Sequence, residues 1–193
     1  LIDVGTGGPA TVLPDVTREQ VAAAAGIDLA ALMAKKDRGE CVVAMTKAAP
    51  ACVAKLAAEG RIDGIISLGG GGGTAIGTAA MRALPLGFPK LMVSTLAAGN
   101  VAPYLGTKDI TMMPSIADVA GLNRLSRVIF TRAAGAICGM VGAIPEVGAS
   151  KPLIVASQFG NTTTCVTEAK KVLEAAGYEV LVFAATGTGG RIM

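Results

Sequence analysis

Short apolar segments alternate along the chain with longer stretches in which apolar residues recur every three or four positions. The short segments are typical of buried strands and the longer stretches of amphipathic helices. Because strand, loop and helix follow one another repeatedly from residue 64 onward, the pattern predicts an open parallel α/β sheet. Such a sheet binds ligands at the carboxyl ends of its strands. The expected strands are Leu1–Val4, Gly64–Leu68, Lys90–Ser94, Asp109–Met113, Pro152–Ala156 and Glu179–Phe183.

The helical stretches are bounded by residues that commonly cap or end helices. Thr17 and Asp28 are expected N-caps, and Asp118 is expected to precede a long helix of about 24 residues. Pro50 is expected to kink or break the helix in which it lies. The expected helices are Arg18–Ala25, Leu29–Lys35, Glu40–Glu59, Ala75–Leu84, Val119–Gly142 and Cys165–Ala176.

The order of these elements predicts a Rossmann-like, three-layer α/β fold with two similar halves. Residues 1–146 are expected to form the first half, and residues 147–193 the start of a second βαβ half that residues 1–8 could complete. Leu1–Gly8 is similar to Leu181–Ala184 followed by Gly187–Gly190, and only the second copy follows a complete βα unit. We therefore expect an N-terminal βα unit and a C-terminal domain to be missing from this sequence.

Composition narrows the class of protein. Hydrophobic residues make up 52% of the 193, aromatic residues 3%, and the net charge is +3. This predicts an aliphatic core, no nucleic-acid partner and, because glycines and prolines interrupt the uncharged stretches, no membrane span. The absence of histidine excludes a Ser-His-Asp triad and a histidine-ligated zinc within this chain. The four separated cysteines are interpreted as reduced core residues of a cytoplasmic protein.

The run of five glycines at residues 69–73, between an expected strand and an expected helix, carries the main candidate chemistry. Consecutive glycines cost backbone entropy, but they let main-chain N–H groups approach an anion at the positive end of a helix. No Lys-Ser/Thr pair follows, so the run is not a Walker loop. The first acidic residue after it is Asp109, which disfavours NAD. A tight turn without a ligand is the alternative interpretation.

Other Gly- and Thr-rich segments also follow expected strands. Three adjacent threonines offer hydroxyl groups beside free helix N–H groups, although N-capping alone would explain them. Asn100 either contacts a base or sugar, or simply occupies a turn. The candidate nucleotide-binding residues are Gly70, Gly71, Gly72, Gly73, Thr74, Ser94, Thr95, Gly99, Asn100, Gly160, Asn161, Thr162, Thr163, Thr164, Gly187, Thr188 and Gly189.

Several long motifs resemble one family over essentially the whole chain: Gly70–Ala75, Met81–Gly87, Met92–Thr95, Gly99–Tyr104, Asp118–Arg124 and Ala185–Arg191. This family is the ATP-binding amino-terminal domain shared by the tomato mosaic virus resistance protein and uncharacterised bacterial and fungal proteins. The resemblance implies two Rossmann-like halves that hold ATP on glycine-rich loops. It also implies a further domain after this region, and in the plant member a contact with the helicase region of the viral replication protein.

We therefore expect a nucleotide-binding α/β module of a larger protein, with ATP as ligand, with or without Mg²⁺. Lys90, Lys108 and Arg191 are possible charge partners of the phosphates. One alternative is an enzyme that transfers a group to or from a phosphorylated metabolite. Another is a ligand-free interaction or oligomerisation domain. A homo-oligomer, in the simplest case a homodimer, is expected, with the small residues Ala133–Gly139 as a candidate dimer or domain interface.

Overall fold

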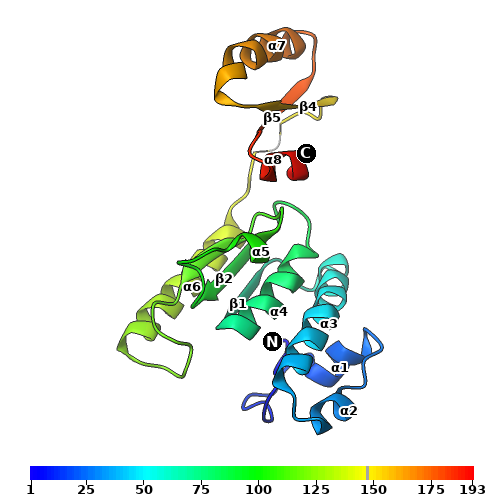
Figure 1. Ribbon diagram of the computed structural model, residues 1–193, viewed down its shortest axis with the longest axis vertical. Helices are drawn as coiled ribbons and strands as arrows, with labels where there is room; N and C mark the ends of the chain where they lie inside the picture. Colours follow the sequence, from blue (N-terminus) through cyan, green and yellow to red (C-terminus); the bar gives the residue numbers. More distant parts are fainter. Residues whose placement is uncertain (147) are drawn as a thin grey trace. The chain divides into compact units, whose positions relative to one another are not determined.

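The computed structural model describes residues 1–146 and 148–193 (Figure 1). The chain divides into two compact units, Leu1–Ile144 and Pro145–Met193. Both contain helices and parallel strands, as the alternating pattern predicts.

The first unit begins with three helices whose N-termini are capped by side chains of the expected kind. Thr17 forms a capping box with Gln20, Asp28 accepts a hydrogen bond from the Ala31 N–H, and Asp37 accepts one from the Glu40 N–H. These side chains satisfy amide groups that have no partner within the helix. The helices are α1 (Arg18–Ala23), α2 (Leu29–Ala34) and α3 (Arg38–Ala58), and α3 continues through Pro50.

A three-stranded parallel sheet forms the centre of the first unit. Its strands are β1 (Ile65–Gly69), β2 (Lys90–Ser94) and β3 (Thr111–Pro114), in the order β1-β2-β3. All five residues of β2 are buried, as expected for a parallel strand covered on both faces. The register pairs Gly69 with Ser94, and Ser94 with Pro114, so the three strands end together at one edge of the sheet.

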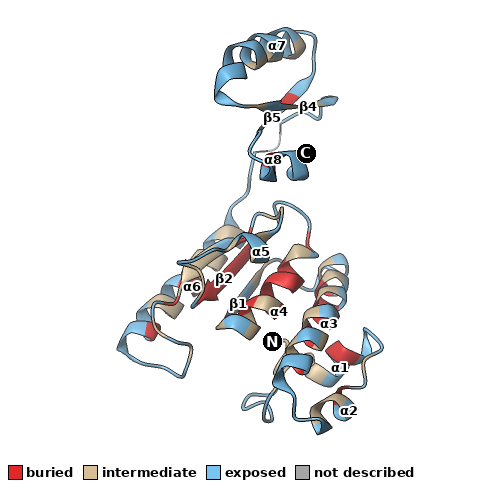
Figure 2. Cartoon of the chain, in the orientation of Figure 1, coloured by how far each residue is buried: buried red, intermediate tan, exposed pale blue. Residues whose placement is uncertain are grey.

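Helices cover both faces of this sheet, which gives the predicted three layers (Figure 1). Helix α4 (Gly71–Arg82) follows β1 and packs between the sheet and α3, with Ile76 and Ala80 beside Met45 and Ala49 of α3. Helix α6 (Arg124–Gly142) packs its Ala133 against β2 on the other face. The short helix α5 (Ala102–Leu105) connects β2 to β3. Figure 2 shows the buried residues concentrated in β2, α3 and α4.

The second unit is a single βαβ element followed by a short helix. Strands β4 (Leu153–Gln158) and β5 (Glu179–Ala184) pair in parallel, and α7 (Thr163–Ala175) connects them after a 3-10 turn, η1 (Gly160–Thr162). Helix α8 (Thr188–Ile192) follows β5. Figure 2 shows most of this unit as exposed. Among its described residues, Val180 and Gly189 are buried.

Three sequence predictions of secondary structure are wrong. Leu1–Val4 is not a strand of the sheet: Ile2 forms an isolated bridge with Val16, and Leu1 is 69% exposed. The long helix begins at Arg124 rather than Val119, because Gly121 adopts a φ of +87° and Asn123 caps the helix instead of Asp118. The glycine run does not form a loop ahead of α4, since Gly71, Gly72 and Gly73 are its first turn.

The cysteines match the prediction only in part. All four are free thiols, and Cys41 and Cys52 are buried in the core as expected, but Cys138 and Cys165 are exposed. Helices α3 and α6 are long and apolar enough to cross a membrane by length and composition alone. Both pack against other elements of the α/β unit, and core helices of this kind pass the same test.

Candidate functional site

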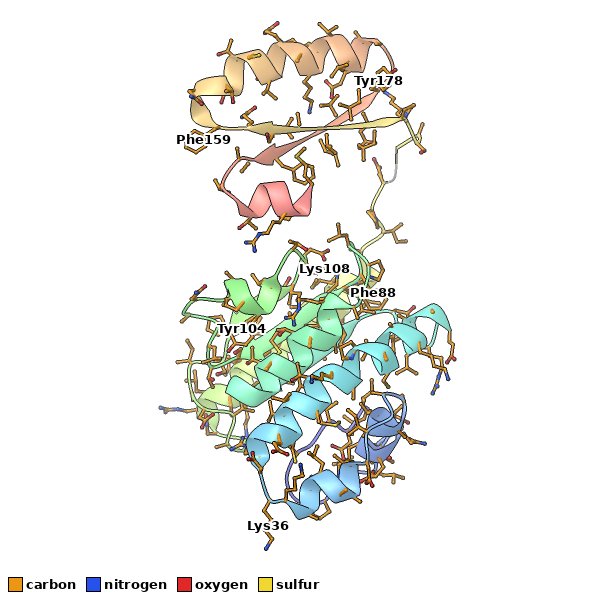
Figure 3. The ribbon with its side chains drawn as sticks, turned by 45° about the vertical axis from the view of Figure 1, so that its right-hand side comes forward. Lys36, Phe88, Tyr104, Lys108, Phe159 and Tyr178 are labelled. Atoms are coloured by element: carbon orange, nitrogen blue, oxygen red, sulfur yellow. The ribbon has the colours of Figure 1, made fainter. Side chains whose placement is uncertain are left out.

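The carboxyl ends of β1, β2 and β3 form the edge at which a parallel sheet binds ligands. The glycine run, the segment from Ser94 to Asn100 and the segment from Ser115 to Asp118 leave the sheet at this edge. The structure therefore brings the predicted residues of the first unit to one end of one sheet. Figure 3 shows Phe88 and Lys108 at the end of the first unit where the strands begin.

The five glycines of the run have different reasons to be glycine. A Cβ atom on Gly69 would lie 2.7 Å from the Cα of Gly73, so this residue must be glycine for β1 and α4 to pack closely. A Cβ on Gly72 would touch the side chain of Val42 at 3.1 Å. A Cβ on Gly71 would have no atom within 4 Å apart from its chain neighbours and the backbone of its own helical turn. Packing therefore does not explain Gly71, which faces open space at the start of α4.

Helix α4 begins without a side-chain cap. Gly70 is its N-cap residue, and the Thr74 N–H donates to the Gly70 carbonyl at 2.8 Å as the first bond of the helix. The N–H groups of the first turn, on Gly71, Gly72 and Gly73, precede that bond and have no acceptor within the helix. They point out of the helix at the positive end of its dipole, where they attract an anion.

Two of the predicted ligand-binding side chains are used inside the protein. Thr74 and Ser94 are both fully buried, and their hydroxyl oxygens lie 2.6 Å apart in a hydrogen bond. The Ser94 hydroxyl oxygen also accepts a hydrogen bond from the Leu96 N–H at 3.0 Å. This pair ties the first turn of α4 to the end of β2, so Thr74 and Ser94 position the glycine turn instead of facing solvent.

Thr95 and Asp118 flank the glycine turn. A Cβ atom on Gly70 would lie 3.7 Å from the Thr95 hydroxyl oxygen and 3.9 Å from a carboxylate oxygen of Asp118. Both side chains belong to exposed residues. A tight turn after β3 places Asp118 there: Ser115 donates its hydroxyl to the Ala117 carbonyl, and Ile116 adopts a φ of +64°. The predicted role of Asp118 as a helix cap is wrong, because the turn aims it at α4.

The remaining predicted residues of the first unit lie in the exposed connection between β2 and α5. The Gly99 N–H donates to the Leu96 carbonyl, and the Asn100 side-chain oxygen accepts from the Ala102 N–H at 3.1 Å. Asn100 therefore forms a local turn with this side-chain oxygen. Its NH₂ group has no protein acceptor within the described residues.

The predicted loops of the second unit are organised by local contacts. Thr162 donates its hydroxyl to the Phe159 carbonyl, accepts from the Phe159 N–H, and thereby caps the 3-10 turn that contains Gly160, Asn161 and Thr162. Thr163 and Thr164 begin α7. Gly187 adopts a φ of +81° before the five-residue α8, and a Cβ on Gly189 would lie against the carbonyl oxygen of Ala184. The two loops follow β4 and β5, as predicted.

Charged residues stand at both ends of the sheet. The prediction that Lys90 is a charge partner of the phosphates is wrong, because Lys90 lies at the start of β2, at the opposite end from the glycine turn, and is fully buried. Lys108 donates to the Leu84 carbonyl at the same end. Within the described residues there is no group of three or more His, Cys, Asp or Glu side chains placed to bind a metal ion.

Comparison with known proteins gives two family matches. Residues 1–146 match the N-terminal domain of the uncharacterised protein family UPF0261, and residues 151–193 match its C-terminal domain. A UPF0261 protein of Clostridium tetani is 52% identical over 194 residues, covering all of this chain and 48% of that protein. The UPF0261 protein RA0729 of Rhizobium meliloti is 51% identical, covering all of this chain and 47% of that protein.

A plant protein is also similar. The ToMV resistance protein Tm-1(GCR237) of Solanum lycopersicum is 40% identical over 164 residues, which cover 81% of this chain and 22% of that protein. The chain spans about half the length of the bacterial relatives that it matches.

Proposed function

The chain belongs to the UPF0261 family of uncharacterised proteins, and on that premise we propose that its first unit is a nucleotide-binding module that holds the phosphates of ATP. The proposal rests on one observation: α4 begins in a glycine turn at the carboxyl edge of a parallel sheet, with no side-chain cap and open space at Gly71. The motif resemblance to the ATP-binding domain family supports the same ligand.

The N–H groups of Gly71, Gly72 and Gly73 are the proposed phosphate donors. They require no charged side chain, because three aligned amides and the helix dipole already favour a negative group. Thr95 adds a hydroxyl group beside the turn. Asn100, on the exposed segment that follows β2, is the proposed contact for the sugar or base, through its NH₂ group.

Asp118 supports a role for Mg²⁺ in this site. A carboxylate within about 4 Å of the position that a Cβ of Gly70 would take repels a bare phosphate. A divalent cation between the two anions removes the repulsion, and oxygen ligands such as carboxylates and phosphates are the ones that Mg²⁺ prefers. The residues present therefore fit a nucleotide bound with Mg²⁺, in which Asp118 would contribute one oxygen ligand and the nucleotide the others.

The test is Gly71→Ala in the purified protein, with ATP binding measured by titration calorimetry with and without Mg²⁺. Because the added Cβ meets no protein atom, folding is unaffected, whereas the methyl group occupies the space that a phosphate needs. We expect the wild type to bind ATP. At an ATP concentration of roughly 100 times the dissociation constant, its free energy of unfolding should rise by about 2.7 kcal/mol. Gly71→Ala should lose most of that gain.

Gly135→Ala is the matched control. Gly135 lies on the exposed side of α6, and a Cβ there also has no neighbour within 4 Å. This variant should bind ATP as the wild type does. Equal binding by wild type and Gly71→Ala would refute the site, and no binding by the wild type would refute the function. Phosphate release during the titration would favour the alternative that the module is part of a group-transfer enzyme.

One observation favours self-association as a second role. The outward side of α6 exposes 43% of Leu125 and 45% of Val128, on the same side of the helix as the small residues Gly135 and Gly139. Apolar surface of this kind commonly marks a contact with another subunit or domain. We propose a homodimer through this face, to be tested by light scattering of the wild type and of Val128→Lys, which should be monomeric.

A further inference from the structure

We propose that the open edge of β1 receives one more parallel β-strand, which the full-length protein supplies from outside residues 1–193. The strand would lie between β1 and the extended residues Leu1–Val4. This inference is independent of the nucleotide site.

The backbone of β1 has donors and acceptors that face away from β2. The Ile65 N–H donates to the Pro89 carbonyl, and the Gly69 carbonyl accepts from the Thr95 N–H, so both residues face β2. In a parallel strand the direction of the backbone groups alternates from one residue to the next. The N–H and C=O groups of Ile66 and Leu68 therefore face the open edge, where an added strand would pair with them.

Apolar clefts border this edge on both faces of the sheet. On the side of α3 and α4, a cavity of about 310 Å³ lies between Leu1–Val4 and Ile65–Ser67, with Val53 and Ile76 in its wall. On the side of α6, a groove of about 470 Å³ is lined by Gly64, Ile66 and the helix residues Ile137 and Val141. A parallel strand with apolar side chains on both faces would fill the two clefts with alternate residues.

The first cleft also indicates how many strands fit. Leu1–Val4 bound it on the side opposite β1, and their backbone is held by hydrogen bonds to Asp15 and Val16. The edge of a second copy would have to bring a whole sheet into a space bounded by these residues. A single strand fits such a space, which favours a segment of the same protein over a second molecule.

The chain itself contains an example of the expected unit. In the second unit β4, α7 and β5 form a βαβ element in which β4 pairs in parallel with β5. Leu1–Gly8 resembles β5 and the glycines that follow it. Relatives that match the whole chain are about twice as long, so a further strand and helix are available in proteins of this family. If that strand precedes Leu1–Val4 in the chain, as β4 precedes β5, it would pair with Leu1–Val4 and fill the open edge of β1.

The test is amide hydrogen exchange, resolved to single residues, in the full-length protein. Ser67 faces β2 and is the protected reference within the same strand. We expect the amides of Ile66 and Leu68 to exchange at rates within about tenfold of the Ser67 amide. The backbone of an added strand would accept hydrogen bonds from these amides or shield them from water. Exchange of either amide more than about tenfold faster than Ser67 would overturn the proposal. Protection that disappears on dilution would assign the edge to a second copy and would also overturn it.

Ile66→Pro tests the pairing directly. Proline at this position removes the N–H that faces the open edge and leaves the bonds to β2 intact. In the full-length protein, exchange at Leu68 should accelerate by at least about tenfold in Ile66→Pro and stay unchanged in the control Ile66→Val, which keeps the N–H. Unchanged exchange at Leu68 in Ile66→Pro would count against an added strand.

Discussion

Lys90 is the largest fully buried side chain of the protein, and its replacement by methionine is the most informative stability experiment. The Lys90 ammonium group donates to the Pro85 carbonyl at 2.8 Å, to the Phe88 carbonyl at 2.9 Å and to an Asp109 carboxylate oxygen at 2.6 Å. These bonds hold the loop between α4 and β2 against the start of β3. Lys90→Met keeps the length and the burial of the side chain and removes all three donors.

The expected loss of stability depends on whether water can hydrogen-bond the three acceptors once the lysine is removed. Removing one partner of a fully enclosed ion pair costs about 3–5 kcal/mol. Here the Asp109 side chain is 44% exposed and Pro85 is exposed, so water can replace part of the lost bonding. We therefore expect Lys90→Met to lower the free energy of unfolding by about 1–3 kcal/mol. For a unit of this size each kcal/mol lowers Tm by about 2–4 °C.

The assay is urea unfolding at pH 7, followed by circular dichroism, on wild type, Lys90→Met, Asp109→Asn and the double variant. The two single losses should sum to more than the loss in the double variant, because each removes the same ion pair. If Lys90→Met is as stable as the wild type or more stable, the buried ammonium costs as much to desolvate as its hydrogen bonds return. That result would refute the stabilising role given to Lys90.

The same pair predicts a dependence on pH. Burial by itself would raise the pKa of Asp109, but the hydrogen bonds from Lys90 and the Gly87 N–H outweigh it and lower the pKa below 3.8. The folded pKa thus lies below the unfolded one, so this contribution is complete above about pH 4. It is lost as the pH falls through the folded pKa. Asp109→Asn should therefore show a smaller loss of stability on acidification than the wild type.

Three further predictions concern packing, capping and thiol reactivity. Gly77→Ala should lower the free energy of unfolding by about 1–3 kcal/mol, because its Cβ would lie 2.6 Å from the Ser67 hydroxyl oxygen. Ser67→Gly should restore part of this loss, and a Gly77→Ala variant as stable as the wild type would contradict this packing. Asn123→Ala should cost about 1 kcal/mol in thermal unfolding, since Asn123 caps α6 through the N–H groups of its first turn; no change would mean another cap. Cys138 should react with Ellman's reagent well before Cys52, whose burial raises its thiol pKa, and equal rates would contradict the burial of Cys52.

The strands were the most predictable part of the fold. Lys90–Ser94 is an apolar run bounded by turn residues, and β2 has these bounds. The pairing partner of Leu1–Val4 was not predictable, because a short apolar run does not specify which strand lies beside it. The start of α4 was not predictable because glycine is a poor helix former, yet Gly71, Gly72 and Gly73 form the first turn of this helix.

Only part of the candidate site was predictable from the sequence. A glycine run after a strand is visible in the sequence, and so is its place at the carboxyl edge. The burial of Thr74 and Ser94 was not, since it depends on the register between β1 and β2. Asp118 was interpreted as a helix cap because it precedes an apolar periodic stretch. Its position beside Gly70 depends on the left-handed backbone at Ile116, which the residue type disfavours.

The hydroxyl groups of Thr74 and Ser94 are buried and hydrogen-bond each other. A substitution at one position therefore affects which residues are tolerated at the other. Losing one hydroxyl removes a buried hydrogen-bond partner of the other, whereas Thr74→Val combined with Ser94→Ala removes both hydroxyl groups and leaves only the Leu96 N–H without its acceptor. A library randomised at these two sites and screened for folded protein should yield matched polar pairs or matched apolar pairs. The residues that hold the glycine turn in place are thus expected to change together, because they share one buried hydrogen bond.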